Sequence, residues 1–372
     1  MKTQINFSPK LGIFQVNFTL NSWEIPNRSF SLNKDCSLNR LLVDGEESSI
    51  IPKRMGNLEV YDLPMGHRYE LQYQLRLPME KQWFFIEDDG VVLPLFGEDQ
   101  PRIRETEVIL PDDYVVLSSH ELLKVQHHNK LLRFRFSGST PPVFSIAKYL
   151  GDRIFSGEIY LLKKASNLEL LSRMLREGHD YLTRHLGSGV FPQPLRYVVL
   201  PSGEKPFLYG GTIFFVWPEE EKGLRGFEEV LRSYIGLGWG VDADEKPEFL
   251  IEGLNLYFTG RVLKLLYSNQ EYEAFLEETQ ERKDLIAGKP LEQLVGRDLA
   301  LSSWLLLEEL EDFLGQEQMD QIMKIFLERH RQRRTDLHHF YDTFSSLAWK
   351  EGVKAFLEER LYGKKDNQSS SF

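Results

Sequence analysis

The hydrophobic period of the chain changes once, and this change limits the folds that it can adopt. Up to about residue 155, apolar and polar residues alternate in short runs at 13–20, 69–77 and 131–136. A period of two is typical of half-buried β-strands. Beyond that point the apolar residues take helical spacing, first at 168–186. The sequence therefore predicts a β-rich N-terminal part followed by a part that is mostly helical.

The second part also contains a strand. Residues 195–200 have the apolar, β-branched composition of a buried strand, and a proline follows them. Further helical patterns occur at 227–236, 248–267, 299–314, 318–331 and 353–361. We therefore expect an α+β multidomain fold. An antiparallel β-sandwich or saddle domain at 1–155 precedes an α/β domain at 156–362 with a mostly helical C-terminal half, and a polar, Ser-rich tail at 363–372 is expected to be disordered.

Composition excludes several classes of protein. The 372 residues include 45 Lys and Arg against 56 Asp and Glu, a net charge of −11 that repels phosphate backbones, so no nucleic-acid partner is expected. The single cysteine, Cys36, cannot form an internal disulfide or a Cys-based zinc site and is expected to be a buried thiol. Neither a signal-peptide pattern nor an apolar stretch of about 18 residues is present, which predicts a cytoplasmic protein without a membrane span.

The most specific signal is a Trp-Gly pair followed by a helix with an acidic residue. Trp239 and Gly240 precede, after a loop, a predicted helix that contains Glu252, Gly253 and Tyr257. This order resembles that of the aminopeptidase N family of thermolysin-like zinc metallopeptidases (gluzincins). In that family a helix with the H-E-x-x-H motif precedes W-G, and the Glu of a later W-L-N-E-G-x-x-x-Y helix is the third zinc ligand. The resemblance implies a thermolysin-like domain in the second part of the chain.

A second resemblance lies upstream, at 208–213. This segment is similar to the family's G-x-M-E-N element, which binds the amino terminus of a substrate. On this interpretation Gly210, Gly211, Thr212 and Ile213 form the former substrate-cleft strand, and Ile213 replaces the Glu. The carboxylate that holds a substrate amine would then be absent. We expect this strand to be an edge of its sheet that could accept a peptide by strand addition.

The zinc-site positions can be checked one by one. If Trp239 and Gly240 match the family's W-G, Arg232 and Gly236 replace the two His ligands, Ser233 replaces the general-base Glu, and only Glu252 remains. Zinc peptidases need three protein ligands, so that the ion can lower the pKa of a bound water to about 7. A single carboxylate beside a cationic Arg232 cannot replace them, and Ser233 is not a base near neutral pH. The family's catalytic Tyr also lacks a counterpart.

These losses predict a protein without catalytic residues, bound metal or cofactor. The resemblance then implies a pseudopeptidase that acts as a binding or scaffold subunit and holds a peptide or protein partner in the former substrate cleft. One alternative is a divergent hydrolase or aminopeptidase-like enzyme with altered or metal-independent chemistry. Another is that the resemblance is coincidental. A further hypothesis is that Arg232 and Glu252 form an internal ion pair that fills the former zinc site.

Overall fold

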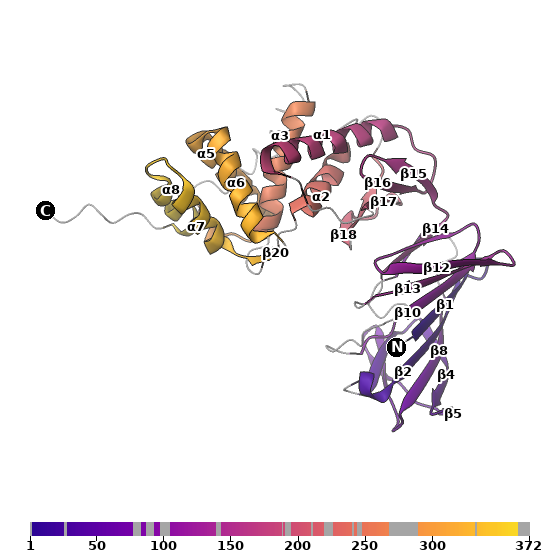
Figure 1. Ribbon diagram of the computed structural model, residues 1–372. Coiled ribbons are helices and arrows are strands. Elements are labelled where there is room, and N and C mark those ends of the chain that lie inside the picture. Colours follow the sequence, from indigo (N-terminus) through magenta and orange to yellow (C-terminus); the bar gives the residue numbers. More distant parts are fainter. Residues whose placement is uncertain are drawn as a thin grey trace. The chain divides into compact units, whose positions relative to one another are not determined.

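The structure is a computed structural model, and Figure 1 shows its course from the indigo N-terminus to the yellow C-terminus. It describes residues 2–25, 28–76, 83–86, 93–96, 105–138, 143–187, 189, 195–209, 211–218, 226–239, 242–243, 248–267, 289–331 and 333–363. The chain divides into two compact units. One comprises Met1–Leu150 with Leu161–Lys164, and the other comprises Gly151–Tyr160 with Ala165–Phe372. Apart from Gly363, the expected tail at 363–372 lies outside the described residues.

The first unit consists of β-strands. They are β1 (Lys2–Ser8), β2 (Ile13–Asn21), β3 (Ser29–Asn33), β4 (Cys36–Val43), β5 (Glu46–Glu47), β6 (Lys53–Met55), β7 (Leu58–Asp62), β8 (Arg68–Arg76), β9 (Trp83–Ile86), β10 (Glu105–Pro111), β11 (Val115–Ser118), β12 (Glu121–His128), β13 (Leu131–Ser137) and β14 (Phe144–Ala147). The larger sheet has the order β12-β13-β10-β1-β2-β8-β4-β5, and two smaller sheets have the orders β11-β14-β9 and β3-β7-β6. The runs of alternating residues at 13–20, 69–77 and 131–136 are confirmed as β2, β8 and β13, except that Leu77 lies outside the described residues.

Alternation of side chains explains how these sheets build one core. Every second residue of β2 and β8 is buried, and buried residues from all three sheets join the same hydrophobic cluster. Phe7 stacks on Phe14 with ring centroids 4.6 Å apart and meets Phe84 edge-on at 4.9 Å. The expected burial of the Cys36 thiol is confirmed. One pair of strands, β1 and β10, is parallel, a direction that periodicity alone does not specify.

The second unit combines a sheet with helices. Its strands are β15 (Leu150–Ile154), β16 (Gly157–Leu161), β17 (Leu195–Leu200), β18 (Phe207–Tyr209) and β19 (Thr212–Val216), in the order β15-β16-β17-β19-β18, together with the short pair β20 (Asp242–Ala243) and β21 (Arg334–Thr335). The helices are α1 (Leu168–Leu186), α2 (Glu228–Trp239), the π-helical segment η3 (Glu248–Gly253), α3 (Leu254–Leu266), the 3-10 turn η4 (Leu291–Gln293), α5 (Gly296–Leu314), α6 (Gln316–His330), α7 (Leu337–Leu347) and α8 (Val353–Tyr362). None of the helices in the described ranges is long and apolar enough to cross a membrane.

Most of these elements occur where the sequence predicts them. Helix α1 has the predicted bounds, while α2 extends three residues beyond the predicted end at residue 236. Helix α7 was not predicted, because its two adjacent histidines weaken the apolar pattern. Its start is nevertheless well defined, since the Asp336 side chain accepts a hydrogen bond from the backbone N–H of His339 at 2.8 Å.

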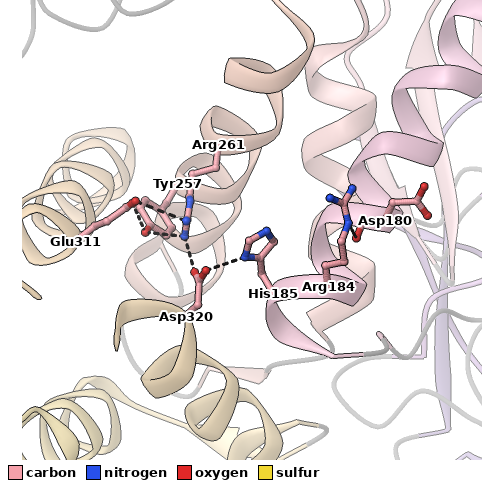
Figure 2. Close-up of polar contacts among 7 residues, drawn as sticks. All are labelled: Asp180, Arg184, His185, Tyr257, Arg261, Glu311 and Asp320. Atoms are coloured by element: carbon pink, nitrogen blue, oxygen red, sulfur yellow. Dashed lines mark hydrogen bonds and ion pairs between the residues drawn. The ribbon is translucent and has the colours of Figure 1, made fainter. Parts of the chain in front are cut away.

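A largely buried arginine, Arg261, links four helices of this unit (Figure 2). The Arg261 guanidinium on α3 donates to Asp320 of α6 at 2.7 Å and lies 3.5 Å from a carboxylate oxygen of Glu311 on α5. It is also 5.5 Å from the ring centroids of Tyr181, on α1, and Tyr257. We call this set the Arg261 cluster; with His185, which contacts Asp320 at 2.8 Å, it comprises Tyr181, His185, Tyr257, Arg261, Glu311 and Asp320. The cluster fixes α1, α3, α5 and α6 to one another.

Candidate functional site

Helix α2 carries the positions where the family pattern has its metal ligands and base. Arg232 does not extend across to a neighbouring helix. Its Nη2 donates to the Glu229 carboxylate one turn earlier on the same helix, at 3.1 Å. The Arg232 side chain is 40% exposed, so this ion pair lies at the surface of the helix. The guanidinium is therefore held by its own helix.

Gly236, in the second-histidine position, faces α3 at very short range. A Cβ atom added to Gly236 would lie 2.6 Å from the side-chain nitrogen of Asn255, closer than real Cβ atoms come to a neighbour. Asn255 is itself buried on α3. The space that a side chain at position 236 would need is therefore occupied by an amide.

The expected ion pair between Arg232 and Glu252 is wrong. Glu252 lies in η3 and is exposed, and no ion pair joins it to Arg232 among the described residues. The reason is the antiparallel packing of α2 and α3, in which Gly236 meets Asn255 while Tyr267 donates to Glu228 at 2.5 Å. Arg232 lies one turn before Gly236 on α2, and Glu252 lies about one turn before Asn255. Because the two helices run in opposite directions, these two displacements point away from each other. At 1.5 Å of rise per residue this separates them by ~10 Å along the helices.

The four former zinc-site positions do not fit a zinc ion. They offer a guanidinium engaged with Glu229, the hydroxyl of Ser233, a glycine, and one exposed carboxylate. Zinc sites require several deprotonated nitrogen, sulfur or oxygen ligands at about 2.0–2.3 Å. Over the part of the chain that the structure describes, no group of three or more His, Cys, Asp or Glu side chains could hold a metal ion.

The former substrate-cleft strand was expected to be an edge of its sheet, and this expectation is wrong. Thr212 and Ile213 begin β19, which pairs with β17 on one side and with β18 on the other. Gly211 precedes them in a turn with φ of 77°, a conformation that favours glycine, and Gly210 lies outside the described residues. Because β18 already occupies the outer side of β19, a peptide cannot add there as a strand. The edge strand on this side of the sheet is β18, which has three residues.

A pocket of about 620 Å³ opens beside Arg232, between α2, α3 and the loops that flank β18 and β19. We call it the α2–α3 pocket. Its described lining residues are Ser202, Gly203, Glu204, Pro206, Val216, Trp217, Pro218, Gly226, Glu228, Glu229, Arg232, Leu256 and Thr259. By the helical offset described above, it lies one turn towards the start of α2 from the former second-ligand position.

The lining of this pocket combines one aromatic wall with several polar groups. Trp217 packs edge-on against Phe227, with ring centroids 5.2 Å apart, which fixes the indole at the pocket wall. Thr259 is 3% exposed, and its hydroxyl has no hydrogen-bond partner within the described structure. A buried hydroxyl without a partner costs about 1–3 kcal/mol of stability.

Tyr234, next to Ser233 on α2, contacts helix α1. Burial raises the pKa of Tyr234, beside Ser233, to about 12. Its hydroxyl pairs with Nδ1 of His179 at 3.0 Å, a contact between α2 and α1. In the described structure the Ser233 hydroxyl makes no hydrogen bond to a histidine or a carboxylate that could activate it.

Comparisons with known proteins relate this fold to one class of peptidase. Neither protein-family models nor curated proteins give a match. Among solved structures, a mutant M1 zinc metallopeptidase from Deinococcus radiodurans bound to a Tyr-Ser-Ala substrate is similar at 14% identity and a TM-score of 0.60, covering 98% of this chain and 93% of that one. The structure of Legionella pneumophila aminopeptidase A in complex with aspartic acid is similar at 13% identity and a TM-score of 0.66, covering 97% of this chain and 48% of that one.

This likeness shows the fold alone. The chain has an M1 aminopeptidase-like fold, and the prediction of an α+β multidomain protein with a β domain followed by a thermolysin-like domain is confirmed. It spans about half of the Legionella protein. Sequence reasoning did not identify Asn255, Trp217 or Thr259 as parts of the site. Asn255 is a polar residue on an otherwise apolar helix face, which is the one signal that could have indicated it.

Proposed function

We propose that this chain is a non-catalytic relative of M1 peptidases, a pseudopeptidase, that serves as a binding or scaffold subunit. The observation that supports this most strongly is the contact between Gly236 and Asn255. Where the family pattern requires an imidazole, the chain has a glycine, and a neighbouring side chain fills the remaining space. On this proposal, the zinc site of the family has lost its histidine ligands, and the space of one of them is filled by Asn255.

The partner that we propose is a peptide or protein segment, held in the α2–α3 pocket. Its volume of about 620 Å³ lies within the range of about 300–1,000 Å³ that is common for ligand pockets. The Deinococcus relative in fold was solved with a tripeptide, which favours the same class of ligand here. The Trp217 wall and the polar residues around it supply the mixed apolar and polar surface that a peptide side chain needs.

Metal content and peptidase activity of the purified full chain test the non-catalytic role. We expect substoichiometric zinc after dialysis and no release of amino acids from a panel of unblocked tripeptides, with or without added zinc. Stoichiometric zinc, or aminopeptidase activity that a chelator abolishes, would refute the proposal. Peptide cleavage that resists chelators would instead indicate the altered chemistry of a divergent hydrolase. Arg232→Ala serves as the matched variant, because cleavage by a contaminating peptidase would not respond to it.

A further inference from the structure

Strand β12 (Glu121–His128) forms one edge of the eight-stranded sheet (Figure 1). It pairs with β13, and its other side has no partner strand among the described residues. All eight of its residues are exposed, whereas β2 and β8 bury every second residue. An edge of this length presents a row of backbone N–H and C=O groups with which a further strand can pair.

The apolar side chains of β12 point to the core side of the sheet and are left uncovered. Leu122 lies opposite Phe136 of β13. Val125 lies opposite Phe134 in the same way. Directly opposed residues of antiparallel strands share a face, and both phenylalanines are buried, whereas Leu122 is 45% and Val125 is 46% exposed. A strand added beside β12 would bring apolar neighbours to these two side chains.

The solvent side of β12 carries a charge that β13 does not neutralise. Lys124 lies opposite Arg135, a residue of the same sign. Arg135 shares the Glu107 carboxylate with Arg133, at 3.8 Å and 3.7 Å. Lys124 itself forms no ion pair within the described ranges. An added strand is therefore favoured if it brings an acidic side chain close to Lys124.

A β-bulge limits which strands can pair here. The register with β13 shifts between Leu122 and Lys124, so Leu123 is an extra residue in β12. Bulges and lysines on edge strands oppose indiscriminate pairing. A partner strand must therefore match the two halves of β12 on either side of the bulge, and it must also compensate the charge of Lys124.

A second copy of β12 that runs antiparallel matches both halves. If Leu122 lies opposite Val125 of the second copy, Glu121 lies opposite Gln126 of the second copy, and the two-fold axis crosses the strands at the bulge. Core-side residues then meet core-side residues, and solvent-side residues meet solvent-side residues, as antiparallel pairing requires. The leucine and the valine of each copy cover those of the other.

The same register brings opposite charges together on the solvent side. The diagonal neighbours of Glu121 are Lys124 and His128 of the second copy, about 7–8 Å away and within reach of a lysine side chain. Because the two-fold axis repeats this contact, each Lys124 receives one carboxylate. Strand β12 is therefore complementary to itself in both its apolar and its charged residues.

We propose that β12 mediates self-association of this chain, in which two copies join edge to edge through antiparallel pairing of Glu121–Gln126. The two eight-stranded sheets become continuous across the two-fold axis. Six residues from each copy form a small interface, so the dimer is weak, with a dissociation constant of about 10–100 μM. This inference depends neither on the non-catalytic role nor on the α2–α3 pocket.

Analytical ultracentrifugation of the full chain tests the proposal. Between about 5 and 500 μM protein, we expect the weight-average mass to rise from that of one copy towards that of two. The mass of one copy at the highest concentration would overturn the proposal and would leave β12 for a strand of a different protein.

Two lysine substitutions locate the interface. Val125→Lys places a charge on the apolar side of the edge and should weaken association at least about tenfold. Ile51→Lys is the matched control, because Ile51 is 91% exposed, lies outside β12 and should leave association unchanged. Equal association of the Val125→Lys variant and the unsubstituted protein would refute the role of β12. Circular dichroism verifies that both variants are folded.

A charge exchange tests the register. Lys124→Glu places carboxylates of the two copies near each other and should weaken association about tenfold. Adding Glu121→Lys restores opposite charges and should return the dissociation constant to within about threefold of the original value. If the double variant associates no better than Lys124→Glu alone, the register is wrong.

Cysteine crosslinking gives a direct readout of the same register. Directly opposed residues have Cβ atoms about 4.5–5.5 Å apart, so a chain with both Leu122→Cys and Val125→Cys should form a covalent dimer on oxidation. Each single variant faces an apolar residue of the second copy and should stay monomeric on a non-reducing gel. The buried Cys36 does not compete. Equal crosslinking of a single variant and the double variant would contradict the proposed pairing.

Discussion

Replacing Arg261 with methionine should destabilise the second unit strongly, and the structure allows the loss to be estimated. Methionine keeps an unbranched stem between Tyr181 and Tyr257, so the substitution removes mainly the charge and its hydrogen bonds. The Arg261 side chain is 11% exposed and its partner Asp320 is 12% exposed. Removing one member of a buried ion pair costs about 3–5 kcal/mol, because the other charge stays buried without compensation.

Two remaining contacts place the expected loss at the lower end of this range. Asp320 keeps His185 at 2.8 Å, and Glu311 keeps the Tyr257 hydroxyl at 2.6 Å. We therefore expect about 3 kcal/mol for Arg261→Met. Urea unfolding followed by far-ultraviolet circular dichroism reports mainly the helices of this unit. With a slope near 3 kcal/mol per M, the midpoint should fall by about 1 M.

A double-mutant cycle decides whether the ion pair causes this loss. Asp320→Asn removes the charge that Arg261 neutralises, so the double variant should lose less than the sum of the two single losses. We expect a coupling energy of about 1–3 kcal/mol. A loss below about 1 kcal/mol for Arg261→Met, or additive losses in the cycle, would show that the Arg261 cluster is not the buried electrostatic link that its geometry indicates.

Three further predictions follow from single contacts. Gly253→Ala would overlap the Cβ atom of Ser303 and should cost about 1–3 kcal/mol in urea unfolding, with part of the loss recovered in a double variant with Ser303→Gly. Burial, followed by nearby positive groups, lowers the pKa of His330 below its usual value. As pH falls below about 6.5, the His330 imidazole is therefore protonated in the unfolded chain before it is protonated in the folded protein, and stability decreases. The His330→Gln variant should show a smaller fall in melting temperature between pH 7 and about pH 5 than the unsubstituted protein. A variant with histidine at positions 232 and 236 and glutamate at position 233 should not bind stoichiometric zinc, as measured by mass spectrometry. Adding Asn255→Gly to this variant should at least recover the stability that is lost when the histidine at position 236 overlaps Asn255.

Periodicity predicted the elements whose burial follows a simple repeat. Helix α1 buries one face along its whole length, and strands β2 and β8 bury every second residue, so their patterns are readable without tertiary information. The family pattern around Glu252 and Gly253 likewise indicated the second unit's fold. Gly253 has a local reason to be glycine, since α5 packs against it through Ser303.

What the sequence did not predict depends on neighbours from other elements. Whether β19 is an edge depends on where β18 pairs, and hydrophobic alternation is the same for an edge and an internal strand. Arg232 was expected to reach Glu252 because both fall in the family's zinc-site positions. The helix offset instead places Glu229 within reach and Glu252 ~10 Å away along the axis. Such register information is absent from a single sequence.

The contact at Gly236 bears on whether a histidine ligand could be introduced at this position. Asn255 occupies the volume beside Gly236, so a histidine introduced there alone meets the amide before it meets an ion. Removing Asn255 alone leaves a cavity beside a glycine, which is also destabilising. Each single change is therefore unfavourable by itself, and only the combination can be accommodated. The contact between Gly236 and Asn255 also holds α2 and α3 close together beside the α2–α3 pocket.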